Sequence, residues 1–314
     1  MEKVVWDDQY NLGVEVIDKA HAKLFRIVGK LMFLVNSGEN GESACKEGLK
    51  YLENYTMKHF FEEEAYMRSI RYKEYGRHKK IHDDFRNKTL SALKWNLESE
   101  GYSPAAVQRF VGTLLGWLTG HIMTEDQAIV GKVTVKKIYD RSAEISIVAR
   151  AVNRAMQDVF RLDAKLVDED YNGRNVGSGF YCRLDYDMDD GSRIQLLLGV
   201  EEQLLLKGVG MLLGMPALRQ DRIVEQAAIQ IFQMLFGHMG RLFRIDTPPE
   251  LSREDMLTQA QFREDFMKRY PCNLLFETRV GHFIFCFRKK RIKSQAAGGA
   301  VKNTERSGSA RCIS

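Results

Sequence analysis

Apolar residues recur every three or four positions over about the first 130 residues, which predicts four long amphipathic helices. Asp18 is expected to cap the first helix, and the polar and glycine residues at 36–41 are expected to end it. The other three are predicted over residues 42–67, 72–98 and 103–130. Because short connections force consecutive helices to pack side by side, we expect an all-α, up-down-up-down four-helix bundle.

The pattern changes in the second half of the chain, where segments with strand-like alternation follow a helix. Helices are predicted over residues 143–160, 202–213 and 222–243. Strands are predicted over residues 180–186, 194–200, 273–279 and 282–288. Asp189-Asp190-Gly191 and Val280-Gly281 supply the turns between paired strands. We therefore expect an α+β domain in which helices lie on an antiparallel sheet.

The length of the chain and the distribution of its charge predict the number of domains and one class of partner that is absent. A chain of 314 residues is long enough for two domains, which we predict at residues 1–132 and 140–291. Residues 292–314 have almost no large apolar side chains and are predicted to be a disordered basic tail. The whole chain carries a net charge of +5, whereas residues 288–314 contain eight Lys or Arg and one acidic residue. The rest is nearly neutral, so we expect no nucleic-acid partner.

The cysteines and the apolar stretches indicate a cytoplasmic protein. The five cysteines are scattered and never paired as C-x-x-C, which is typical of free thiols in a reducing compartment. The first residues contain no apolar run of signal-peptide length. The most apolar later stretch, residues 194–215, is interrupted by Glu201, Glu202 and Lys207, so we expect neither a membrane span nor a membrane partner.

Five of the seven histidines lie in the predicted bundle, where they predict a metal site. The second helix carries a histidine and a glutamate four residues apart, and the third carries two histidines four residues apart. At this spacing both side chains point from the same face of the helix. The first and fourth helices each add a histidine, and the fourth adds an aspartate. Five imidazoles and two carboxylates exceed the four ligands of a tetrahedral zinc and fit two metal ions that share bridging carboxylates. The predicted ligands are His21, His59, Glu63, His78, His82, His121 and Asp126.

These residues closely resemble the motif of the hemerythrin family, bacterial type, over residues 1–132. The family has a lone His, then His-Phe-x-x-Glu-Glu, His-x-x-x-His and His-Ile-x-x-x-Asp. The chain matches these segments at residues 21, 59–64, 78–82 and 121–126. The resemblance implies reversible binding of dioxygen, as partner and ligand, at two iron ions with an oxo or hydroxo bridge.

The resemblance also implies a role for each ligand. One iron is expected on His78, His82 and His121, and the other on His21 and His59. Glu63 and Asp126 are expected to bridge them, and the iron with two histidines has room for dioxygen. The residues that resemble the apolar lining of the oxygen pocket are Phe60, Trp117, Leu118 and Ile122, for which plain core packing is the alternative. The residues expected to lie outside the site are Glu62, Glu64 and Glu125, as a solvated face, and His238 and His282, as ordinary histidines.

The second half resembles the chemotaxis phosphatase family of CheX and CheC in the order of its elements and in the long helix over residues 225–237. Active members carry Glu-x-x-Asn followed by Gly on this helix. Gln230 and Gln233 occupy the first two places here, and Gly237 keeps the third. An amide at 233 can orient water, but a neutral Gln230 cannot make the charged contact of an acid. The alternative is polar surface on an amphipathic helix, so whether this domain is an enzyme stays open.

Three functions follow from this organisation. The first is an oxygen or redox sensor in which the bundle signals through the CheX-like domain, in chemotaxis or two-component signalling. The second is an oxygen-regulated phosphatase acting on a response regulator. The third is a store of oxygen or iron. The partners implied by the second half are a CheY-type response regulator or other signalling protein, and a second copy of the chain in a homodimer.

Overall fold

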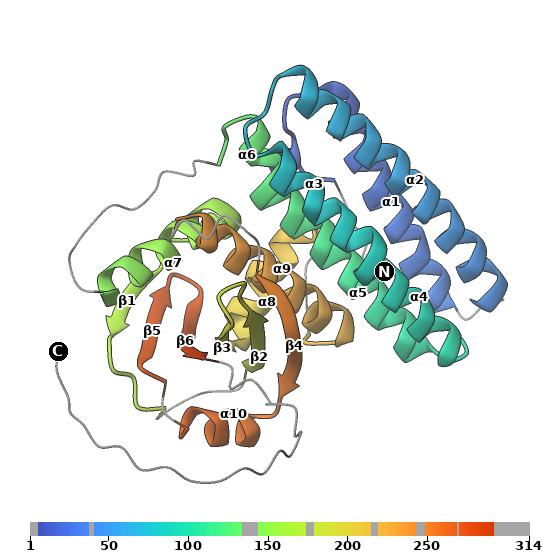
Figure 1. The fold of residues 1–314 in the computed structure, drawn as a ribbon. Coiled ribbons are helices and arrows are strands. Elements are labelled where there is room, and N and C mark those ends of the chain that lie inside the picture. Colours follow the sequence, from blue (N-terminus) through green and yellow to red (C-terminus); the bar gives the residue numbers. More distant parts are fainter. Residues whose placement is uncertain are drawn as a thin grey trace, which may run out of the picture.

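The chain forms a helical bundle followed by an α+β domain, and the two lie against each other (Figure 1). The computed structural model describes residues 6–37, 41–133, 144–173, 179–214, 219–242, 249–268 and 270–291. The predicted tail lies outside these residues. Within them, none of the helices is both long and apolar enough to span a membrane.

Four helical arms confirm the predicted bundle. The first two are the helices α1 (Glu15–Ser37) and α2 (Gly41–Ser69). The third arm consists of α3 (Tyr75–Asp84), the π-helical turn η2 (Phe85–Thr89) and α4 (Leu90–Ser99). The fourth consists of α5 (Pro104–His121), the π-helical turn η3 (Ile122–Asp126) and α6 (Gln127–Ile129). A short 3-10 helix, η1 (Asp8–Tyr10), precedes the bundle.

Two predicted helix starts differ from the structure. The first helix begins at Glu15, three residues before Asp18, whose carboxylate instead accepts hydrogen bonds from the backbone N–H groups of Leu12 and Gly13 at 2.6 and 2.9 Å. The third arm begins at Tyr75 rather than at residue 72, because the preceding turn contains Arg71 at φ 54°. Asp18 therefore stabilises the preceding turn from within the first turn of α1, and the left-handed conformation of Arg71 delays the start of the third arm.

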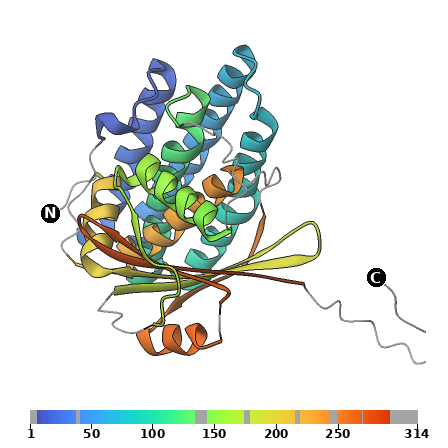
Figure 2. The ribbon, with the colours of Figure 1, turned by 90° about the vertical axis from the view of Figure 1, so that its left-hand side faces the viewer.

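The second domain is an antiparallel sheet of six strands in the order β1-β5-β6-β3-β2-β4, as predicted for the α+β class. The strands are β1 (Lys165–Asp168), β2 (Gly179–Asp187), β3 (Ser192–Glu201), β4 (Glu250–Leu257), β5 (Cys272–Thr278) and β6 (Gly281–Arg291). The helices are α7 (Glu144–Phe160), α8 (Glu202–Leu212), α9 (Arg222–Leu242) and α10 (Gln259–Phe266). Figure 2 shows α10 alone on one face of the sheet and the other helices on the opposite face, toward the bundle.

The sequence pattern missed three of these elements, namely β1, β4 and α10. Strand β4 lies at the edge of the sheet, and its side chains are mostly exposed, so it lacks the apolar alternation that marks a half-buried strand. Helix α10 did have a recognisable signal. Thr258 and Gln261 form a capping box, in which each side chain bonds to the other residue's backbone N–H.

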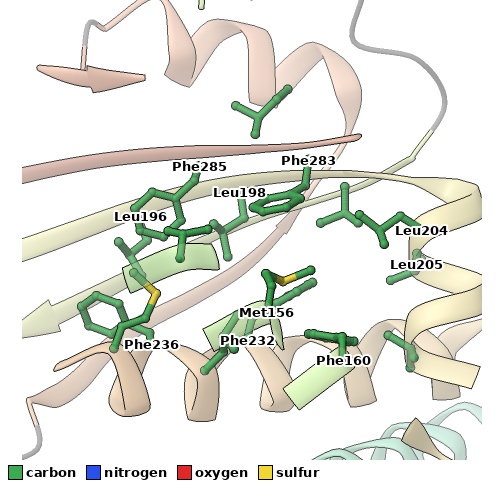
Figure 3. Close-up of a pocket in the computed structure, with 16 residues that line it drawn as sticks. Met156, Phe160, Leu196, Leu198, Leu204, Leu205, Phe232, Phe236, Phe283 and Phe285 are labelled. Atoms are coloured by element: carbon green, nitrogen blue, oxygen red, sulfur yellow. The ribbon is translucent and has the colours of Figure 1, made fainter. Parts of the chain in front are cut away.

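The inner face of the sheet and the helices α7, α8 and α9 enclose an apolar layer (Figure 3). Phe232 and Phe236 of α9 face Leu196 and Leu198 of β3 across this layer, around a cavity of about 40 Å³. The same cluster of buried apolar side chains continues through α9 into the bundle. Packing therefore joins the sheet, α9 and the bundle into one continuous core.

Candidate metal centre

Four helical arms bring the seven predicted ligands to one point in the bundle, where each is at most 1% exposed. His21 lies on α1, His59 and Glu63 on α2, His78 and His82 on α3, His121 at the end of α5 and Asp126 at the end of η3. Asp126 joins the other six residues only because η3 is a π-helical turn. Five residues along an ordinary α-helix would point Asp126 about 140° away from His121. The wider turn, closed by the Gln127 N–H on the Ile122 carbonyl, brings Asp126 back above His121.

Three imidazoles form one group on the α3 and α5 side. The Nε2 atom of His82 lies 3.2 Å from Nε2 of His78 and 3.0 Å from Nε2 of His121. All three therefore direct their ring nitrogens at a common point. The Oε1 atom of Glu63 completes this group, 2.8 Å from Nε2 of His78 and 3.5 Å from Nε2 of His82.

Two imidazoles form the other group, on the α1 and α2 side. The rings of His21 and His59 meet edge to face, with centroids 4.5 Å apart. The second oxygen of Glu63, Oε2, lies 3.2 Å from Nε2 of His59 and 3.7 Å from Nε2 of His21. Glu63 thus directs one oxygen at each group of histidines.

Asp126 repeats the same arrangement from the opposite arm. Its Oδ2 atom lies 3.2 Å from Nε2 of His21, in the group of two. Its Oδ1 atom lies 3.0 Å from Nε2 of His121 and 3.4 Å from Nε2 of His78, in the group of three. The two carboxylates therefore connect a set of three imidazoles with a set of two.

The buried charges fit metal cations between these groups. None of the four carboxylate oxygens of Glu63 and Asp126 has a hydrogen-bond partner of suitable geometry among the described residues, although all are buried. Burial opposes ionisation, but the surrounding imidazoles outweigh it and hold the pKa of both carboxyl groups below the ordinary value. Burial also lowers the pKa of His59 and His82, which favours neutral rings. Burial acts in the same direction on His21, but Asp126 and Glu63 outweigh it and raise the pKa of that imidazole to about 9, so a metal ion must displace a proton there. Ionised carboxylates and neutral imidazoles are the forms that bind metals.

Comparison with known proteins agrees with this geometry. Residues 12–133 match the family described as the hemerythrin HHE cation binding domain. The bacteriohemerythrin of Clostridium acetobutylicum is 32% identical over 129 residues, which cover 40% of this chain and 98% of that protein. The myohemerythrin of Theromyzon tessulatum is 30% identical over 132 residues, or 42% of this chain and 95% of that protein. The chain belongs to the hemerythrin family.

The hemerythrin match ends at residue 133, before the α+β domain. That part of the chain aligns with a solved structure of the chemotaxis protein CheX from Vibrio vulnificus. The alignment covers 46% of this chain and 98% of that structure, at 11% identity and a TM-score of 0.35. A likeness of this size assigns no function to the α+β domain.

Aromatic rings surround the three-histidine side of the hemerythrin domain. Phe60 stacks on His82 with ring centroids 3.9 Å apart, and Trp117 stacks on His121 at 4.5 Å. Leu118 and Ile122 are also buried. Two of the four residues predicted to line an oxygen pocket therefore hold ligand rings in place, and the pocket itself stays a prediction.

Two carboxylates next to the ligands are buried, so the expected solvated face is wrong for them. Glu64 accepts from Nδ1 of His82 at 3.3 Å, which leaves Nε2 of that ring free to bind a metal. Glu125 accepts from the Arg77 guanidinium at 2.8 Å. Sequence reasoning missed Arg77, and the available signal was its position directly before the predicted ligand His78.

The residues at the phosphatase positions lie apart from the metal centre. Gln230 is buried on α9, and Gln233 donates a hydrogen bond to Glu254 of β4 at 2.6 Å. Both line a cleft of about 640 Å³ between α9 and the hemerythrin helices α3 to α5. Each of the two histidines outside the bundle pairs with a carboxylate. His238 pairs with Asp158, and His282 pairs with Glu201.

Metal loading is expected to stabilise the fold. The seven donor groups meet only in the folded chain, since they are dispersed over residues 21–126. Binding at a hundred times the dissociation constant adds about 2.7 kcal/mol to the free energy of unfolding, which corresponds to a rise in Tm of roughly 5–10 °C. Calorimetry of metal-free and iron-loaded protein measures this shift. Equal melting temperatures in a loaded sample would contradict a metal centre built from these groups.

Proposed function

We propose that this chain is a non-heme di-iron protein that binds dioxygen in its hemerythrin domain and acts as an oxygen or redox sensor. Its α+β domain is the output, in chemotaxis or two-component signalling. The observation that carries the proposal is the pair of carboxylates, Glu63 and Asp126, each with one oxygen toward either histidine group. Carboxylates in this position can bridge two neighbouring metal ions, and the mixed imidazole and carboxylate donors suit iron.

The residues divide the work of the site. His78, His82 and His121 supply three nitrogen donors to one iron. His21 and His59 supply two to the other, which leaves that side open for dioxygen. The iron pair, when bound, supplies reversible electron exchange with the gas. Buried apolar side chains such as Ile122 exclude water, which slows proton entry and favours reversible binding over oxidation chemistry.

The packing of the two domains supports the sensor over a simple store. A ligand changes an output only when it binds two conformations with different affinity. Helix α5 ends at the ligand His121 and lies along α9, which in turn packs on the sheet. A store would need no such connection between its metal centre and a second domain.

A phosphatase has less support from the geometry. The cleft lined by Gln230 and Gln233 has the volume of a small-molecule site, far too small for a response regulator. A phosphorylated regulator would reach these amides only after the bundle moved away from α9. The regulator is therefore proposed as a signalling partner of the α+β domain.

The proposal is tested by anaerobic iron reconstitution followed by an optical spectrum in air. We expect about two irons per chain and a visible charge-transfer band that appears with air and disappears on deoxygenation. His59→Ala is expected to abolish the band, because it removes one of the two histidines of the open group. His282→Ala, a half-exposed histidine of the α+β domain, is the control and should leave the band unchanged. A colourless wild-type protein with well under two irons would overturn the proposal.

A further inference from the structure

Helices α5 and α9 touch through their backbones. Gly112, Gly116 and Gly120 stand four apart and form one face of α5. A Cβ atom at Gly112 would lie 2.6 Å from the carbonyl oxygen of Ile223, and one at Gly116 would lie 2.5 Å from the Cα of Ala227. No layer of side chains separates the two helices here. A movement of α5 must therefore be followed by α9, since packed backbones cannot absorb it by changing rotamers.

The metal centre lies on the same stretch of α5. His121 directly follows Gly120, which packs against Met234 of α9. Trp117 directly follows Gly116 and stacks on the His121 ring. The His121 imidazole and the glycine face are thus separated by no more than the width of helix α5. If His121 shifts, the surface of α5 that contacts α9 shifts with it.

One buried side chain, that of Arg77, connects the residues next to two further ligands, His78 and Asp126, with helix α9. Arg77 precedes His78, and its Nη1 donates to Oε2 of Glu125 at 2.8 Å. Glu125 in turn precedes Asp126. The Nη2 of Arg77 reaches the carbonyl oxygen of Gly237 on α9, at 3.5 Å. The Arg77 side chain is 9% exposed, so its charge is little screened by water.

We infer that the glycine face of α5, together with Arg77, is the route by which occupancy of the metal centre changes the α+β domain. Arg77 is a positioning residue in this route, since it acts through Glu125 and Gly237 and not on the metal. Helix α9 carries the change onward, because Phe232 and Phe236 pack against the inner face of the sheet (Figure 3). The inference rests on the proposed function in one respect, namely that the seven groups bind metal.

The test is hydrogen exchange of the full chain, followed by mass spectrometry, in metal-free and metal-loaded protein. Loading is expected to slow amide exchange in residues 222–242 by roughly five-fold or more, the lower end of ordinary coupling between sites. Arg77→Gln is expected to reduce this difference to less than half while the metal content per chain stays that of the wild type. Arg86→Gln is the matched control, because Arg86 pairs with Asp83 on the bundle surface.

A double variant and a second metal ion separate the coupling between the domains from the effect of a buried charge and from dioxygen binding. Arg77→Gln removes a positive charge that faces the buried Glu125 carboxylate, so the double variant Arg77→Gln with Glu125→Gln removes both charges together. Cobalt(II), loaded under anaerobic conditions, is expected to occupy the same nitrogen and oxygen donors with no dioxygen present. A failure of the oxygen proposal thus appears in the iron spectrum, whereas the coupling is measured separately with cobalt.

Three results would overturn the inference. One is identical exchange in residues 222–242 of metal-free and metal-loaded wild-type protein. Another is a chain that takes up neither metal. The third is a wild-type difference that persists in both Arg77 variants. A difference lost in the Arg77 variants but kept in Arg86→Gln supports the route.

Discussion

Glu63→Gln is expected to lower the iron bound after reconstitution from about two atoms per chain to less than one, because it removes the carboxylate proposed to bind both metal ions. The Glu63 carboxylate faces His78 with one oxygen and His59 with the other. An amide is neutral, and its NH2 group cannot replace either oxygen as a donor. Loss of a residue that only supports a ligand costs 10- to 100-fold in metal affinity, so loss of a bridging ligand should cost more than about 100-fold.

Elemental analysis of desalted protein measures this loss. Glu62→Gln is the matched control, since it changes the same residue type one position earlier on α2, where the side chain pairs with Lys58 near the surface. The control should keep the iron content and the optical spectrum of the wild type. Full iron content in Glu63→Gln would show that the carboxylate does not bridge.

Gly116→Ala is expected to lower the Tm by roughly 3–10 °C, the effect of about 1–3 kcal/mol of overpacking. The added methyl group would lie 2.5 Å from the Cα of Ala227, inside the distance that two carbon atoms tolerate. Because the obstructing atoms belong to the backbone of α9, one of the two helices must move. The cost thus falls on the contact between the domains, not on either domain alone.

The matched control is Gly76→Ala. Gly76 lies in α3, where an added Cβ would meet no atom within 4 Å. Alanine favours a helix by up to about 1 kcal/mol over glycine, so this variant should melt at or slightly above the wild-type temperature. Thermal unfolding followed by circular dichroism compares the two. If Gly116→Ala melted like Gly76→Ala, the backbone contact between α5 and α9 would be contradicted.

Local patterns were sufficient to predict most helices and strands, and the helix faces that carry the ligands. The spacing of four between His59 and Glu63 is a property of one helix and needs no knowledge of its neighbours. The turn at Val280-Gly281 likewise predicts a hairpin, which is confirmed by the pairing of β5 with β6. The exposed edge strand β4 was missed, because such a strand has no apolar face to mark it.

The relations between elements came from the tertiary structure. The chain order does not reveal that a π-helical turn brings Asp126 onto the side of His121, or that Glu125 is buried against Arg77. The glycines of α5 are visible in the sequence, but their partner on α9 lies about a hundred residues away. Spacing along a helix determines which side chains share a face, whereas what covers that face depends on contacts between distant segments, and these form only when the whole core packs.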